Sequence, residues 1–87
     1  MKILITIWDT AAEVHSEEVR TFRTRGEAIK AFTRAINDKE TPMGQSPYDY
    51  HLIELGEYDE TFGRITPTHE QNMKIISGKD VLTKTEE

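Results

Sequence analysis

A single amphipathic helix is the sequence feature that most constrains the fold. Apolar residues recur at helical spacing between Glu27 and Asn37, with polar residues on the opposite face. Thr24 and Glu27 form a capping box, in which each side chain accepts a hydrogen bond from a backbone N–H at the helix start. The pair Thr41-Pro42 prevents the helix from continuing. Other apolar segments alternate with a period of two, so the chain must pack one helix against a β-sheet.

Four segments have the alternating pattern of β-strands, at residues 1–8, 19–24, 48–58 and 64–66. Residues 13–16 either pair with the first strand or remain a loop, and residues 73–76 either add a strand or pack as a hydrophobic clip. The sequence therefore predicts a single α+β domain over residues 1–82. We expect a small antiparallel sheet of four to five strands with one helix, in ββαββ order, and a disordered acidic tail over residues 83–87.

Size and charge limit the possible functions. At 87 residues without cysteine, the chain is expected to form one small domain without disulfides or a thiolate metal site. We find no segment long and apolar enough for a signal peptide or a membrane span, which predicts a cytoplasmic protein with no membrane partner. The net charge of −5 argues against a protein that coats nucleic acid by bulk electrostatics.

Charge is nevertheless distributed unevenly along the chain. Residues 19–39 carry six basic and two acidic residues, a local balance of +4. A basic face of this kind can follow the backbone of a nucleic acid. The candidate contacts are Arg20, Arg23, Arg25, Lys30 and Arg34. The sequence leaves open the alternative that these are ordinary solvated side chains, because flanking acidic residues weaken the field.

Aromatic side chains either stack on bases or fill the thin core, and the four candidates are Tyr48, Tyr50, Tyr58 and Phe62. Phe62 differs from the others because it lies in a predicted hairpin turn, residues 59–63, where Gly63 supplies the positive φ of the turn. An aromatic side chain at a hairpin tip is hard to bury. We therefore expect Phe62, together with Tyr58, to contact a protein partner or a second subunit.

The sequence predicts neither an enzyme nor a cofactor or metal site. Its acidic group lacks the spacing of a cation-binding loop, and Glu54 and Glu57 are expected on opposite faces of a strand. The three histidines are dispersed, without ligand spacing, and no nucleophile–base or glycine-rich phosphate motif is present. The acidic group consists of Asp49, Glu54, Glu57, Asp59 and Glu60.

Three stretches give the chain a family resemblance. They read Asn-Asp-Lys-x-Thr-Pro at residues 37–42, Pro-x-Asp-Tyr-x-Leu and Leu-Gly-Glu-Tyr-Asp-x-x-x-Gly within residues 47–63, and Ile-Ser-Gly-Lys-Asp-Val at residues 76–81. With these motifs the chain resembles the small nonstructural protein of gokushoviruses, which are single-stranded-DNA bacteriophages of the family Microviridae. The resemblance implies a protein made in the host cytoplasm and absent from the capsid.

Two functions follow from these observations. The resemblance implies a role in viral DNA replication or packaging, by binding single-stranded DNA or the replication complex. The alternative is a non-enzymatic protein-interaction module that regulates a phage or host replication protein, with a homodimer as one form. A small sheet with apolar residues on both faces favours a homo-oligomer, because one helix cannot cover two faces.

Overall fold

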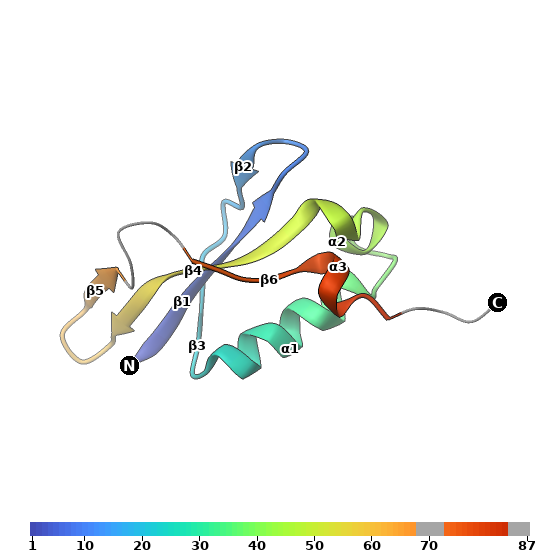
Figure 1. The fold of residues 1–87 in the computed structure, drawn as a ribbon. Coiled ribbons are helices and arrows are strands. Elements are labelled where there is room, and N and C mark those ends of the chain that lie inside the picture. The colour runs from blue at the N-terminus through green and yellow to red at the C-terminus, as the bar shows by residue number, and fades with distance from the viewer. Residues whose placement is uncertain (68–72, 84–87) are drawn as a thin grey trace.

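In the computed structural model, which describes residues 1–67 and 73–83, six strands form one antiparallel sheet. The long strands β1 (Lys2–Asp9) and β4 (Tyr50–Asp59) pair at its centre. Each long strand carries two short strands along its outer edge (Figure 1). The short strands on β1 are β2 (Val14–His15) and β3 (Arg20–Phe22), and those on β4 are β5 (Arg64–Pro67) and β6 (Met73–Ser77).

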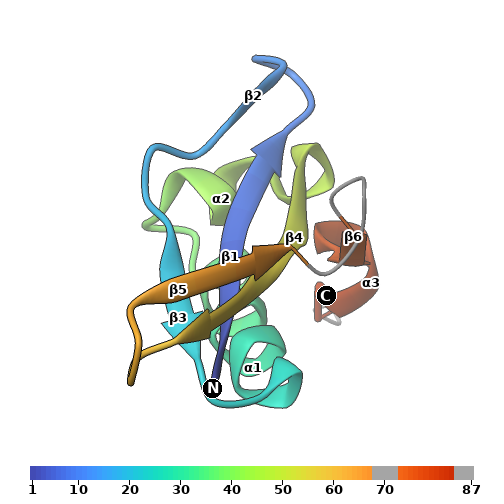
Figure 2. The ribbon, with the colours of Figure 1, turned by 90° about the vertical axis from the view of Figure 1, so that its left-hand side faces the viewer.

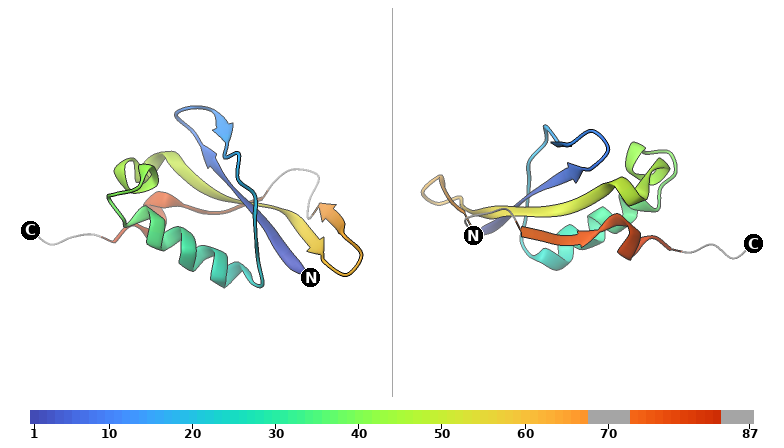
Figure 3. Two further views of the ribbon diagram at one scale, coloured as in Figure 1. Left: turned by 180° about the vertical axis from the view of Figure 1, so that it is seen from behind. Right: turned by 45° about the horizontal axis from the view of Figure 1, so that its top comes forward.

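Helix α1 (Arg25–Ile36) lies along one face of this sheet, as Figures 2 and 3 show from three sides. The Thr24 hydroxyl accepts a hydrogen bond from the Glu27 N–H at 3.1 Å, which confirms the predicted N-cap. The Glu27 carboxylate accepts from the backbone N–H of Arg23 at 3.1 Å. Three short helical segments adjoin the C-terminal end of α1: α2 (Pro42–Gln45), η1 (Pro47–Asp49) and α3 (Gly78–Val81).

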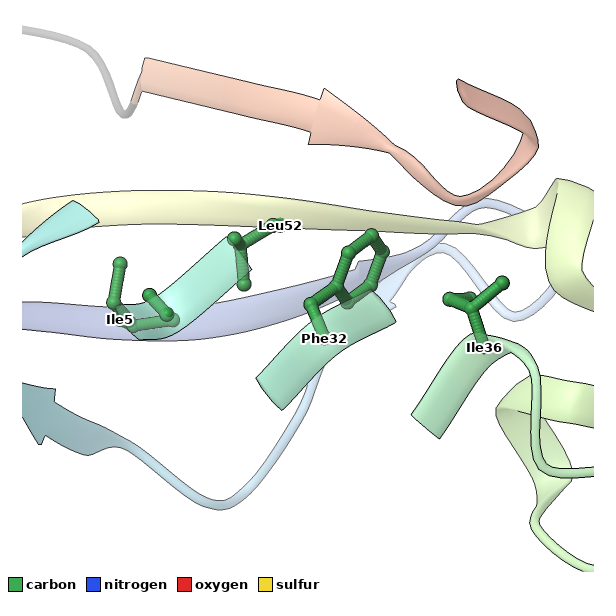
Figure 4. Close-up of a cluster of buried hydrophobic side chains, with 5 residues drawn as sticks. Ile5, Phe32, Ile36 and Leu52 are labelled. Atoms are coloured by element: carbon green, nitrogen blue, oxygen red, sulfur yellow. The ribbon is translucent and has the colours of Figure 1, made fainter. Parts of the chain in front are cut away.

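The core lies between α1 and the central strand pair. Phe32 and Ile36 of the helix lie over Ile5 of β1 and Leu52 of β4 (Figure 4). Ala28 completes this buried cluster. These helix positions belong to the predicted apolar stripe, so the helix faces the sheet as its periodicity indicates.

The α+β class is confirmed, but the predicted strand number and order are wrong. Within the described part of the chain the sheet has six strands rather than four or five, in βββαβββ order around α1. The difference arises because β2 and β6, whose segments the sequence left undecided, are short strands whose partners are the long strands. The expected disordered tail lies outside the described residues except for Thr83.

A β-bulge interrupts the pairing of β1 with β4. Ile5 lies opposite Glu54, and Leu4 lies opposite Gly56, so Leu55 has no partner on β1. Glu57 is then opposite Ile3, and cross-strand partners share a face of the sheet. Glu54 and Glu57 therefore both lie on the face that carries α1. The prediction that they occupy opposite faces is wrong, because strict alternation does not allow for the inserted residue.

Candidate binding surfaces

Arg25, in the first turn of α1, forms a bidentate ion pair with Glu54 of β4. Its Nε lies 2.5 Å from Oε1 and its Nη2 lies 3.2 Å from Oε2. The Glu54 side chain is 1% exposed, whereas that of Arg25 is 52% exposed. Hydrogen bonding to Glu54, followed by the charge of that carboxylate, raises the pKa of Arg25 above its ordinary value. A buried carboxylate is costly without a cation, so this pair holds Arg25 against the protein.

Two more of the predicted nucleic-acid contacts have intramolecular neighbours. Arg23 Nη2 lies 3.6 Å from Glu27 Oε2, one helical turn away in sequence. The Arg20 guanidinium lies 5.1 Å from the centre of the Phe22 ring, which is a cation–π geometry. Both arginines remain exposed. The Arg23 charge is partly offset by a neighbouring carboxylate, and Arg20 lies against an aromatic ring.

Lys30 and Arg34 lie one turn apart on the exposed side of α1. Together with Thr33, Asn37 and Asp38 they line a shallow surface depression. Within residues 1–67 and 73–83 neither cation forms an ion pair. Two of the five predicted nucleic-acid contacts thus lie in this depression, and the other three are ion-paired or stacked arginines between β3 and the first turn of α1.

The β4–β5 hairpin presents apolar side chains to solvent. Phe62 at its tip is 75% exposed, and Ile65 of β5 is 58% exposed. The Asp59 carboxylate accepts hydrogen bonds from two backbone N–H groups of the turn, at 2.9 and 3.4 Å, and Gly63 has the positive φ that the sequence predicts. Tyr58 is half-buried and lies opposite Ile65. The turn is therefore fixed by local bonds while its aromatic side chain stays exposed.

An apolar groove of about 300 Å³ lies beside α1 on the helix-bearing face of the sheet. Ile5 and Leu52 of the central strands contribute to its lining, as does Phe22 of β3. On the helix side it is lined by Ala31 and Ala35, whose short side chains leave the space open. This groove was not predicted from the sequence. The available signal was the run of alanines along one side of the predicted helix.

Asn37 connects the C-terminal end of α1 to the last described segment of the chain. Its Nδ2 donates to the carbonyl oxygens of Thr33 and Val81 at 2.8 and 3.0 Å, and its Oδ1 accepts from the N–H of Thr83 at 2.7 Å. Asn37 and Val81 belong to two of the stretches that carry the family resemblance. The structure thus brings these motifs into direct contact.

Close backbone contacts reinforce this end of the molecule. A Cβ on Gly44 would lie 1.8 Å from the carbonyl oxygen of Asp38, and one on Gly78 would lie 2.0 Å from that of Pro47. Only glycine fits such approaches. We call these contacts, together with Asn37 and its partners, the helix-end cluster. Its motif residues have a structural role in the packing of α1, α2, η1 and α3.

His51 and Ser77 form a side-chain pair between β4 and β6. The His51 Nδ1 lies 2.9 Å from the Ser77 Oγ. Burial lowers the pKa of His51, and the charges of Lys74 and Lys79 lower it further. A serine–histidine contact can activate a nucleophile. Ser77 is buried, however, so the contact serves to join the two strands next to α3.

Among residues 1–67 and 73–83, no group of three or more histidine, aspartate or glutamate side chains is placed to hold a metal ion. In the same residues, no helix has the length and apolar character that crossing a bilayer requires.

A match to a known protein family covers almost the whole chain. The family model described as Phage ORF5 protein matches residues 2–81, which span every element from β1 to α3. Searches of curated proteins and of solved structures gave no significant match. The matched region contains both the helix-end cluster and the β4–β5 hairpin. The chain therefore belongs to the family of phage ORF5 proteins.

Proposed function

We propose that this phage protein is a non-enzymatic interaction module that binds a phage or host replication protein through its β4–β5 hairpin. The observation that carries the proposal is the exposure of Phe62 on a turn already fixed by the Asp59 carboxylate. Exposed aromatic residues are frequent anchors of protein interfaces. A turn that is already ordered loses little conformational entropy when it binds.

The proposed role of such an interaction rests on the sequence resemblance. The resemblance to gokushovirus nonstructural proteins supports a partner that acts in viral DNA replication or packaging in the host cytoplasm. The negative net charge and the intramolecular ion pairs of Arg23 and Arg25 favour a protein partner over direct coating of DNA.

The test is retrieval of a partner from nuclease-treated lysate of infected cells. The wild-type protein is expected to retrieve a phage or host replication protein, and Phe62→Ser is expected to lose it. Tyr48→Ser is the matched control, because Tyr48 is 69% exposed but lies in η1, away from the hairpin. Equal retrieval by wild type and Phe62→Ser would exclude the hairpin as the binding surface.

Direct binding of single-stranded DNA is a second candidate, supported by the two cations of the α1 depression. If Lys30 and Arg34 contact phosphates, the double variant Lys30→Ala, Arg34→Ala should reduce the salt dependence of log K by roughly 1.4. Fluorescence anisotropy of a labelled single strand at low and near-physiological salt, with a duplex control, measures this slope. An unchanged affinity and slope would exclude this helix face. Arg25→Ala is unsuitable, because it removes the partner of buried Glu54.

A further inference from the structure

The groove beside α1 has charged residues of opposite sign at its edge. Glu18 and Arg20 both line it, and both are exposed. Glu18 lies two residues before Arg20, which is the first residue of β3. The groove therefore combines an apolar interior with one acidic and one basic group at its rim.

The hairpin tip has a matching composition. Phe62 is flanked two residues away on either side by Glu60 and Arg64. Arg64 forms no ion pair within the described residues, 1–67 and 73–83. Glu60 lies 3.6 Å from the N-terminal amine and 3.7 Å from Lys2 Nζ, and its side chain is still 47% exposed. The tip thus offers an apolar side chain with one acidic and one basic neighbour, and the groove offers an apolar interior with one basic and one acidic residue at its edge.

We propose that the hairpin tip of one copy docks into the apolar groove of a second copy. Phe62 enters the groove, Glu60 faces Arg20, and Arg64 faces Glu18. When two copies exchange tips reciprocally, the contacts close as a two-fold dimer. The inference rests on the proposed function, since it uses the same hairpin and names a second copy as one partner. Self-association then competes with any other protein for Phe62.

Sedimentation velocity across a concentration series tests the association. The wild-type protein is expected to dimerise, and Phe62→Ser and Ala31→Leu are each expected to weaken dimerisation at least tenfold. Phe62→Ser removes the apolar side chain at the tip, whereas Ala31→Leu fills the groove. Tyr48→Ser should dimerise like wild type, and circular dichroism shows that each variant is folded. A wild-type monomer at several hundred micromolar, or a Phe62→Ser dimer of unchanged affinity, overturns the proposal.

Disulfide trapping tests the geometry, because the native chain has no cysteine. Thr61→Cys protein mixed with Ala31→Cys protein is expected to form a cross-linked heterodimer under mild oxidation. Lys39→Cys protein, altered at an exposed position of the 37–42 stretch, should not cross-link to the tip. Equal cross-linking to both positions overturns docking in the groove.

Charge reversal tests the pairing across the interface. Glu18→Arg should weaken dimerisation, and combining it with Arg64→Glu should restore it; no restoration overturns the assigned pairing. The outcomes also separate the two proposals. A monomeric protein that still retrieves a partner through Phe62 contradicts docking on a second copy and leaves the proposed function intact. A protein that neither dimerises nor retrieves a partner would contradict both the docking proposal and the proposed function.

Discussion

The two ends of β4 use their side chains in opposite ways. At the end next to α2, the helix-end cluster combines the hydrogen bonds of Asn37 with backbone contacts at Gly44 and Gly78 that exclude a Cβ. The β4–β5 hairpin lies at the other end (Figure 1). It leaves Phe62 and Ile65 exposed. Distinctive motif residues thus build the fold at one end of β4, while exposed apolar side chains at the other end remain available for the proposed contacts.

The largest effect is expected from Gly78→Ala in the helix-end cluster. The new Cβ would lie 2.0 Å from the Pro47 carbonyl oxygen and 2.9 Å from Ile36 Cδ1. Backbone must move to relieve this clash, so the free energy of unfolding should fall by about 3 kcal/mol in urea denaturation. Gly26→Ala is the matched control, since its Cβ meets only Thr24 Oγ1 at 3.7 Å. Within α1 that change should stabilise by about 0.7 kcal/mol.

Asn37→Ala should have the next largest effect, because it removes three side-chain hydrogen bonds. One is made within α1, to Thr33, and the other two join the end of α1 to Val81 of α3 and to Thr83. The free energy of unfolding of Asn37→Ala, measured by urea denaturation, should be lower than that of wild type by about 2 kcal/mol. Gln45→Ala is the comparison variant, because Gln45 makes one long, exposed bond to Lys39. Equal losses for the two variants would mean that Asn37 does not hold the helix-end cluster together.

Acidification should lower the stability of the protein through His51, which lies near the helix-end cluster. The folded-state pKa of His51 is lowered from 6.5, first by burial, so the unfolded chain takes up a proton at higher pH than the folded one. Stability is therefore fully present above pH 6.5 and is lost as the pH falls through the lowered folded pKa. Urea denaturation at pH 7.5 and pH 5 measures this loss. The part due to His51 should disappear in His51→Gln.

The smallest effect on stability is expected at the hairpin. Phe62 is exposed, so Phe62→Ser should change the free energy of unfolding by no more than about 0.5 kcal/mol. The same substitution should have the largest effect on binding. A thermal melt compared with wild type checks the stability. If Phe62→Ser destabilised the protein as much as Asn37→Ala, the two ends of β4 would contribute equally to stability.

Much of the local structure could be predicted from the sequence. The cap at Thr24, the apolar stripe of α1 and the hairpin turn at Gly63 all depend on neighbouring residues, and all are present in the structure. The exposure of Phe62 followed from the same turn chemistry. These features need no information about distant parts of the chain.

The parts that were missed depend on long-range contacts. Glu54 lies 29 residues from Arg25, so a local count of charges could not show that this arginine has a buried partner. The bulge at Leu55 arises from pairing with β1 and reverses the face on which later residues of β4 lie. The groove beside α1 likewise requires β3 and β4 in place.

The central pairing of β1 with β4 has a consequence for synthesis of the protein. Asp9 lies opposite Tyr50, although the chain between them covers residues 10–49. At translation rates of about 5–20 residues per second, β1 waits seconds for its main partner to leave the ribosome. During that interval only the short strands β2 and β3 are available to pair with β1. A nascent chain stalled before residue 50 is therefore expected to remain sensitive to protease, whereas the chain released from the ribosome should resist.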